Sequence, residues 1–130
     1  MQATSAPDSV LIADAEPTIC RVFEAKLTKE GRFRVVCAST GADACVFAPQ
    51  NSFDVLLWDL RIRDSDRWLP QLRALCPDAV LLLMSTDDRP VVSSAVSCLN
   101  VADVLIKPFG LDTLQNRVLS ALSERQSHRP

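Results

Sequence analysis

The chain has 130 residues, 48% of them hydrophobic, which is enough to bury the core of one domain. Its 14 Lys and Arg side chains are balanced by 16 Asp and Glu, so it lacks the basic surface expected of a protein that binds nucleic acid or an anionic membrane. No apolar run approaches the roughly 20 residues that span a bilayer, and the N-terminus lacks a signal-peptide pattern. We therefore expect a cytoplasmic protein whose partner is a protein or a small ion.

Short apolar runs alternate with stretches of helical period, which is typical of βα units on a parallel sheet. The predicted strands are 9–13, 33–38, 54–58, 79–84 and 103–106. The third and fourth runs are apolar throughout, which predicts central strands covered on both faces. The predicted helices are a segment from Pro17 to about Gly31, residues 42–47, residues 66–75, and two marked by the apolar stripes Val92-Ala95-Val96-Leu99, after Pro90, and Leu111-Leu114-Val118-Leu122. Flexible tails, 1–8 and 125–130, are expected to flank a domain of 9–124.

Polar side chains follow four of these strands at the points where the strands end. They are Asp14, Asp59, Ser85 and Lys107. Any one of them could simply mark the end of the core, but the four together favour a common pocket, because ligands of open parallel sheets bind at the carboxyl ends of the strands. Two acids, a hydroxyl and an ammonium fit phosphoryl or metal chemistry. The chain has no glycine-rich phosphate loop, which disfavours a nucleotide site.

The five cysteines are odd in number, scattered, and form no C-x-x-C pair; they are Cys20, Cys37, Cys45, Cys76 and Cys98. This pattern indicates neither a zinc site nor a disulfide framework. We interpret them as reduced thiols, most of them buried.

The sequence resembles the receiver domain of bacterial two-component response regulators from Val10 to about Leu122. Four blocks carry the resemblance: "VLIADAEP", "FDVLLWDLRIRDSDRW", "AVLLLMST" and "DVLIKPF". The resemblance implies a single-domain (βα)5 protein of the α/β class, similar to chemotaxis regulators. Its five-stranded parallel sheet would be doubly wound and flavodoxin-like, with strand order 2-1-3-4-5.

The same resemblance implies a role for each polar residue. Asp59 would be the phosphoacceptor for a histidine kinase in a phosphorelay, Ser85 and Lys107 would bind the phosphoryl group, and the chain would be no enzyme beyond self-catalysed transfer and hydrolysis. Mg2+ would be held by Asp14, Asp59 and the backbone carbonyl of Arg61. Two backbone features are also implied: a cis peptide bond before Pro108, and a left-handed conformation at Asn100, which stands where receivers favour glycine.

Three departures from the receiver pattern stand out. Ala15 replaces the second acid of the first block, so Mg2+ binding would be weak, with Glu16 as a substitute ligand because its side chain is longer than that of Asp. Val104 replaces the aromatic ring that reports phosphorylation. Arg63 and Arg67 give the loop after the acceptor an unusual charge, which we interpret as a solvated loop paired with Asp64, Asp66 or Asp87. Trp68, in the same loop, could be core or an exposed contact.

Two functions remain open from the sequence. The first is a stand-alone, phosphorylation-driven receiver, which explains the presence of Asp59, Ser85 and Lys107. Its partners would be a sensor histidine kinase or phosphotransferase and a downstream protein or a second copy, with no direct contact to nucleic acid or membrane. They would dock on the face of the fourth helix, fifth strand and fifth helix. Candidate apolar contributors to that face are Val91, Val92 and Leu105, although core packing is the more common fate of such residues. The alternative is a pseudo-receiver, a protein-interaction module independent of phosphorylation, which Ala15 and Val104 favour.

Overall fold

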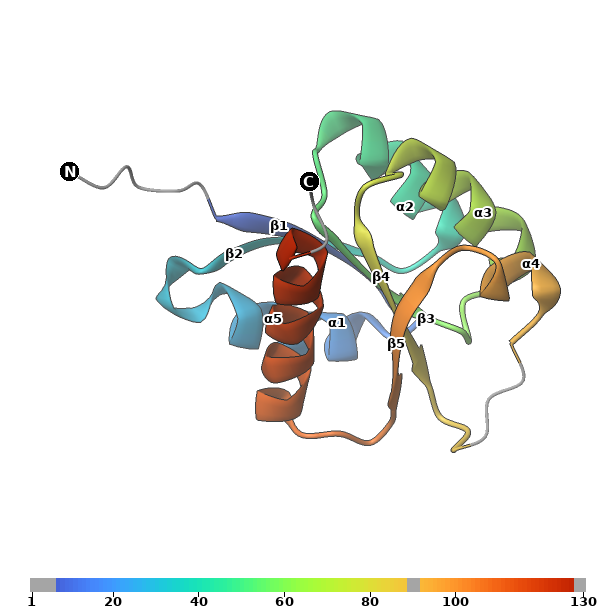
Figure 1. Ribbon diagram of the computed structural model, residues 1–130. Coiled ribbons are helices and arrows are strands. Elements are labelled where there is room, and N and C mark those ends of the chain that lie inside the picture. The colour runs from blue at the N-terminus through green and yellow to red at the C-terminus, as the bar shows by residue number, and fades with distance from the viewer. Residues whose placement is uncertain (1–6, 89–91, 128–130) are drawn as a thin grey trace.

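The computed structural model describes residues 7–88 and 92–127 and contains a five-stranded parallel sheet with the order β2-β1-β3-β4-β5 (Figure 1). The strands are β1 (Asp8–Ala13), β2 (Phe33–Ala38), β3 (Val55–Asp59), β4 (Val80–Ser85) and β5 (Val101–Ile106). The helices are α1 (Pro17–Thr28), α2 (Gly41–Phe47), α3 (Ser65–Leu75), α4 (Ser94–Ser97) and α5 (Leu111–Ser127), with short 3-10 turns η1 (Lys29–Gly31) and η2 (Ala48–Gln50). The predicted doubly wound fold and strand order are confirmed.

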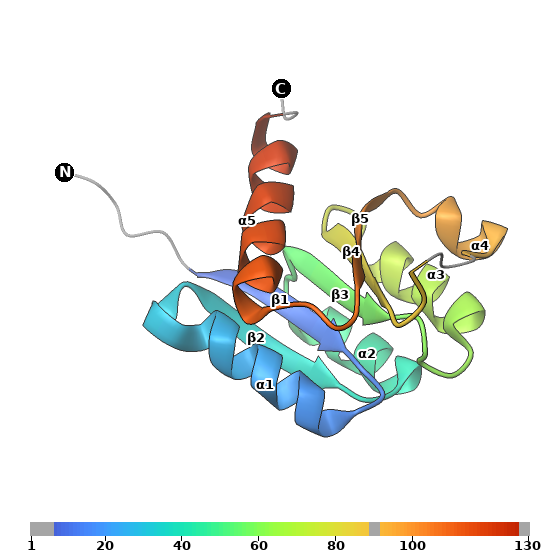
Figure 2. The same ribbon diagram turned by 90° about the horizontal axis from the view of Figure 1, so that it is seen from below.

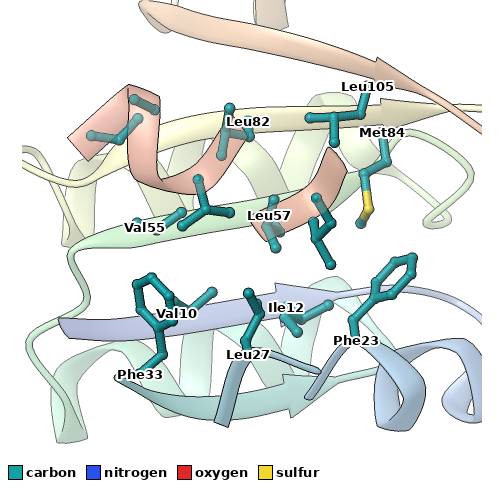
Figure 3. Packing of buried hydrophobic residues seen from close by; sticks show 14 of the residues in the cluster. Val10, Ile12, Phe23, Leu27, Phe33, Val55, Leu57, Leu82, Met84 and Leu105 are labelled. Carbon is teal, nitrogen blue, oxygen red and sulfur yellow. The ribbon is translucent and has the colours of Figure 1, made fainter. Parts of the chain in front are cut away.

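The sheet separates two hydrophobic cores. Alternate residues of β1 illustrate this, because Val10 and Ile12 join the core under α1 and α5, whereas Leu11 and Ala13 join the core under α2, α3 and α4 (Figures 2 and 3). All residues of β3 and β4 are buried, as expected for strands covered on both faces. The sheet lies between two helix layers, so both of its faces are covered by apolar side chains. Polar side chains can therefore cluster only where the strands end.

The helix boundaries follow the predicted ones except around α4. Pro17 opens α1 at its first turn, and the chain after that helix turns through positive φ at Glu30 and at Gly31, the predicted stop. The stripe from Val92 to Leu99 predicted a longer fourth helix, but α4 spans only Ser94–Ser97. Val92 and Leu99 still pack against the core from outside the helix, so their apolar character reflects burial rather than helical structure.

Several single-residue predictions can be compared with the structure. Asn100 has φ of 61°, and the bond between Lys107 and Pro108 is cis, as the receiver pattern implied. Of the two alternatives for Leu105, docking surface or core, the structure shows the core: Leu105 is 2% exposed and packs in the cluster under α5. Val91 lies outside the described residues.

The domain edges also differ from those expected. Strand β1 begins at Asp8 and helix α5 continues to Ser127, so regular structure extends past both predicted bounds. Within the described ranges, no helix is long and apolar enough to cross a membrane.

Helices α2 and α3 meet at a close contact between Gly41 and Trp68. A Cβ atom added at Gly41 would overlap the side chain of Trp68, so the absence of a side chain there permits this packing. Trp68 is partly buried against the core, and the guanidinium of Arg67 lies 4.5 Å from the centre of its ring. Trp68 is thus mainly a packing residue, and Arg67 stacks on it.

We predict that Gly41→Ala lowers the free energy of unfolding by about 1–3 kcal/mol, because the added methyl group overpacks the contact with Trp68. Urea denaturation followed by tryptophan fluorescence would measure the change. Gly110→Ala is the matched control, since a Cβ there meets nothing closer than Thr113 Oγ1 at 3.9 Å. Equal stability of the two variants would contradict the overpacking explanation.

Candidate functional site

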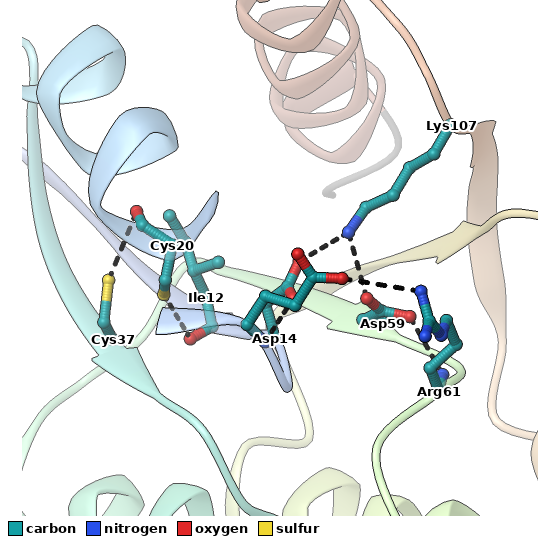
Figure 4. A network of polar contacts seen from close by, with 8 residues as sticks. Ile12, Asp14, Cys20, Cys37, Asp59, Arg61 and Lys107 are labelled. Carbon is teal, nitrogen blue, oxygen red and sulfur yellow. Dashed lines mark hydrogen bonds and ion pairs between the residues drawn. The ribbon is translucent and has the colours of Figure 1, made fainter. Parts of the chain in front are cut away.

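Three polar side chains converge at the carboxyl ends of the strands. Asp14 directly follows β1, Asp59 ends β3 and Lys107 directly follows β5. Because parallel strands all end at the same edge of the sheet, residues far apart in the sequence meet there (Figure 4). The hydrogen bonding between β4 and β5 continues one residue past the end of β5, since the amide of Lys107 donates to the carbonyl of Ser85 at 2.7 Å.

One ammonium group joins the two buried acids. Lys107 Nζ lies 2.6 Å from Asp14 Oδ2 and 3.0 Å from Asp59 Oδ2. The remaining oxygens, Asp14 Oδ1 and Asp59 Oδ1, accept hydrogen bonds of 2.9 Å from the backbone amides of Glu16 and Arg61. Asp14 is 0% exposed and Asp59 is 2% exposed. Although both carboxylates are shielded from water, each of their four oxygens accepts a hydrogen bond from the protein.

Lys107 is positioned by aromatic neighbours as well as by the acids. Its Nζ lies 5.8 Å from the ring centre of Phe23, which in turn stacks on Phe109 at 5.4 Å. Burial alone would lower the pKa of Lys107, but the hydrogen bonds and charges of Asp14 and Asp59 outweigh it, so the pKa is raised above its ordinary value. The side chain therefore stays a cation, which is the form that the two carboxylates need.

Glu16 does not join the two buried acids. Its Oε1 lies 3.5 Å from Arg61 Nη1, and both side chains are more than half exposed, so this ion pair contributes little stability. The pair connects the loop after β1 to the loop after β3. Sequence reasoning considered only the backbone of Arg61 and missed this side-chain role, which the opposite charges of two strand-end loops could have indicated.

Ser85 lies at the end of β4 with its hydroxyl turned to its own loop. The hydroxyl donates to the carbonyl of Asp87 at 3.2 Å and accepts from the amide of Asp87 at 3.0 Å. Val104, at the position of the missing aromatic ring, is partly buried and packs against the core under α3 and α4. Arg63 is an exposed residue of the loop after β3, and Asp66, a predicted partner of the loop arginines, accepts a hydrogen bond of 2.7 Å from Ser93.

A doubly wound sheet with this set of acids, hydroxyl and lysine at its carboxyl edge defines a receiver domain of a signalling protein. The sequence model of the response regulator receiver domain matches residues 10–119. The chain belongs to this family, whose members are phosphorylated by histidine kinases in two-component systems and generally bind Mg2+.

Curated relatives are bacterial transcriptional regulators. The chain is 31% identical over 118 residues to the transcriptional regulatory protein ZraR of Salmonella typhimurium, covering 88% of this chain and 26% of that protein. It is 34% identical over 117 residues to KdpE of Mycobacterium tuberculosis, covering 87% of this chain and 50% of that protein. The chain thus corresponds to a part of these regulators.

Solved structures support the same fold. A CheY-like receiver domain protein of Methanospirillum hungatei superposes with a TM-score of 0.84 at 18% identity, covering 95% of this chain and 99% of that one. A response regulator of Burkholderia pseudomallei, solved with a phosphorylated aspartic acid, calcium ion and citrate, gives a TM-score of 0.76 at 19% identity, covering 92% and 71% of the two chains.

We predict that Lys107→Met lowers the free energy of unfolding by about 3–5 kcal/mol, because it leaves two buried carboxylates without a counter-charge. Equilibrium urea unfolding would measure the loss. In an Asp14→Asn background the same replacement should cost clearly less, since one of the charges is already gone. The same cost in both backgrounds would show that Lys107 does not act through these acids.

Proposed function

We propose that Asp59 accepts a phosphoryl group from the phosphohistidine of a sensor kinase or a phosphotransferase. The supporting observation is the contact of one ammonium, Lys107, with the two buried acids Asp14 and Asp59. In the transfer, a carboxylate oxygen of Asp59 forms a bond to phosphorus while the bond from phosphorus to the histidine nitrogen breaks. The imidazole leaves with the bonding electron pair.

Lys107 and Ser85 would stabilise the product of this transfer. The phosphorylated side chain carries up to about two negative charges, more than the single charge of the free carboxylate. Lys107 already contacts Asp59 and would pair with a phosphoryl oxygen. Ser85 would exchange its bonds with the backbone of Asp87 for one to the phosphoryl group. This exchange would couple the acceptor to the loop after β4.

The acids at the pocket fit Mg2+ only weakly. Among the described residues, no cluster of three or more His, Cys, Asp or Glu side chains is placed to hold a metal ion. Asp14, Asp59 and the backbone carbonyl of Arg61 would form a minimal set of oxygen ligands, since Mg2+ commonly keeps several waters beside one or two carboxylates. When bound, Mg2+ would neutralise negative charge at the phosphoryl oxygens. Lys107 competes for the same carboxylates, and Glu16 pairs with Arg61, so binding would be weak.

The output would be a protein contact on the face formed by α4, β5 and α5. Val92 and Leu99, which lie on either side of α4, are partly buried against the core on the α3 side of the sheet. Val104 has no ring to rotate, so the signal would pass through the loop after β4 instead. The partner would be a downstream target protein or a second copy of the chain.

A pseudo-receiver that binds its partner without phosphorylation is the second candidate. The observation in its favour is that Lys107 and two backbone amides already satisfy every oxygen of Asp14 and Asp59. The unphosphorylated pocket is therefore complete without a metal ion. In this case the pocket would serve stability alone.

The two candidates differ in whether acetyl phosphate, a small phosphoryl donor, modifies Asp59. We predict one phosphoryl adduct on the native protein by intact-mass spectrometry, stronger with millimolar Mg2+. The adduct should be absent from Asp59→Asn, because that variant lacks the attacking oxygen. Ala15→Asp should modify faster at low Mg2+, since it restores an acidic ligand.

Each result assigns the function. An adduct on the native protein that Asp59→Asn removes supports the working receiver. An adduct seen only in Ala15→Asp would mean that one substitution has disabled the site, and would favour the pseudo-receiver. No adduct on any of the folded variants would rule out phosphoryl transfer by this pocket.

A further inference from the structure

Two cysteines meet at the junction of α1 and β2, away from the acid pocket. Cys37 Sγ lies 3.5 Å from the carbonyl oxygen of Cys20. Cys20 Sγ lies 3.5 Å from the carbonyl oxygen of Ile12, which is the residue paired with Cys37 across β1 and β2. Both side chains thus lie between α1 and β2, on the side of the sheet that α1 covers (Figure 4).

We propose that Cys20 and Cys37 form a peroxide-sensitive dithiol that closes to a disulfide and fastens α1 to β2. This modification site is separate from the phosphoacceptor and does not depend on its function. The pair joins residues of two different elements whose contact is otherwise made by apolar packing. A covalent link would therefore fix the position of the helix that supplies Phe23, the aromatic neighbour of Lys107.

The two thiols differ in the way that such a reaction requires. Cys37 lies on β2, one of the two edge strands of the sheet, and is half-buried, so a small oxidant can reach it. Cys20 is 2% exposed and stands behind it. Coupling between the two thiols lowers the pKa of Cys37 and raises that of Cys20, although burial and the carboxylates of Glu24 and Asp14 act against the ionisation of Cys37. Because Cys37 is the more exposed of the two, it is the attacking thiol and Cys20 the resolving thiol.

The chemistry needs a hydroperoxide as oxidant. The Cys37 thiolate attacks one oxygen of hydrogen peroxide, the O–O bond breaks, and hydroxide leaves, which produces a sulfenic acid on Cys37. The Cys20 sulfur then attacks the sulfenic sulfur, the S–S bond forms, and the hydroxyl group leaves as water after taking up the proton of the thiol. In total, the two thiols lose two electrons and the peroxide gains them.

The other three cysteines provide internal controls. Cys45 and Cys76 belong to the opposite side of the sheet, where burial raises the pKa of each thiol. Cys98 is exposed and could link two copies of the protein, so a Cys98→Ser background removes that side reaction. Cys45 and Cys76 then show whether oxidation is specific to the pair at the α1–β2 junction or occurs at any cysteine of the protein.

The experiment treats the reduced Cys98→Ser protein with hydrogen peroxide, blocks remaining thiols by alkylation, and maps peptides by mass spectrometry. We expect an intramolecular Cys20–Cys37 link as the main product, with loss of the mass of two hydrogens and reversal by dithiothreitol. In a Cys20→Ser variant, Cys37 should instead gain oxygen, because the resolving thiol is missing. Cys45 and Cys76 should remain open to alkylation after unfolding.

Two results would overturn the proposal. One is recovery of both Cys20 and Cys37 as free thiols under conditions that oxidise Cys45 or Cys76. The other is oxygen addition to Cys37 in the parent protein with no link to Cys20. Because the parent keeps both cysteines of the pair, its product decides the question even if the Cys20→Ser variant folds poorly.

Discussion

The structure of the site depends on one ammonium group shared by two buried carboxylates. Asp14 and Asp59 are removed from water at adjacent strand ends, and two such charges without a partner would oppose folding. Lys107 reaches them from β5 across the end of the sheet, with Phe23 beside its Nζ. The parallel direction of the strands makes this contact possible, because β1, β3 and β5 all end at the same edge of the sheet. The same contact therefore both completes the fold and holds Asp59, the proposed phosphoacceptor, in place.

The residues that depart from the receiver pattern are all compatible with this contact between Lys107 and the two acids. Ala15 removes one negative charge from a loop in which receivers carry a second acid, and the remaining pair of acids matches what one lysine and two backbone amides can satisfy. Glu16 pairs with Arg61 at the surface rather than with the pocket. Val104 packs against the core in place of a mobile ring. These features together describe a pocket whose carboxylate oxygens all have donors from the protein.

The sequence predicted the parts of this structure that depend on local pattern. Apolar runs located the strands, and polar residues at their ends located Asp14, Asp59 and Lys107. The length of α4 was not predictable, because Val92 and Leu99 are apolar for burial outside a helix. The pairing of Glu16 with Arg61 and the contact of Cys20 with Cys37 were missed, since each depends on how separate elements pack. The register that places Ile12 beside Cys37 is a tertiary property that no single segment encodes.

The most direct test of the shared ammonium is an NMR titration of the Lys107 side chain, observed through its Nζ resonance. Burial acts to lower the pKa of Lys107, but the two carboxylates outweigh burial and raise the pKa above its ordinary value. The ammonium should therefore persist at a pH where exposed lysines have lost their proton. Its contribution to stability is accordingly present at neutral pH and is lost only as the pH rises through this raised value. Asp14→Asn should bring the pKa down. Titration of Lys107 at or below the pH of the exposed lysines, unchanged by Asp14→Asn, would contradict the shared contact.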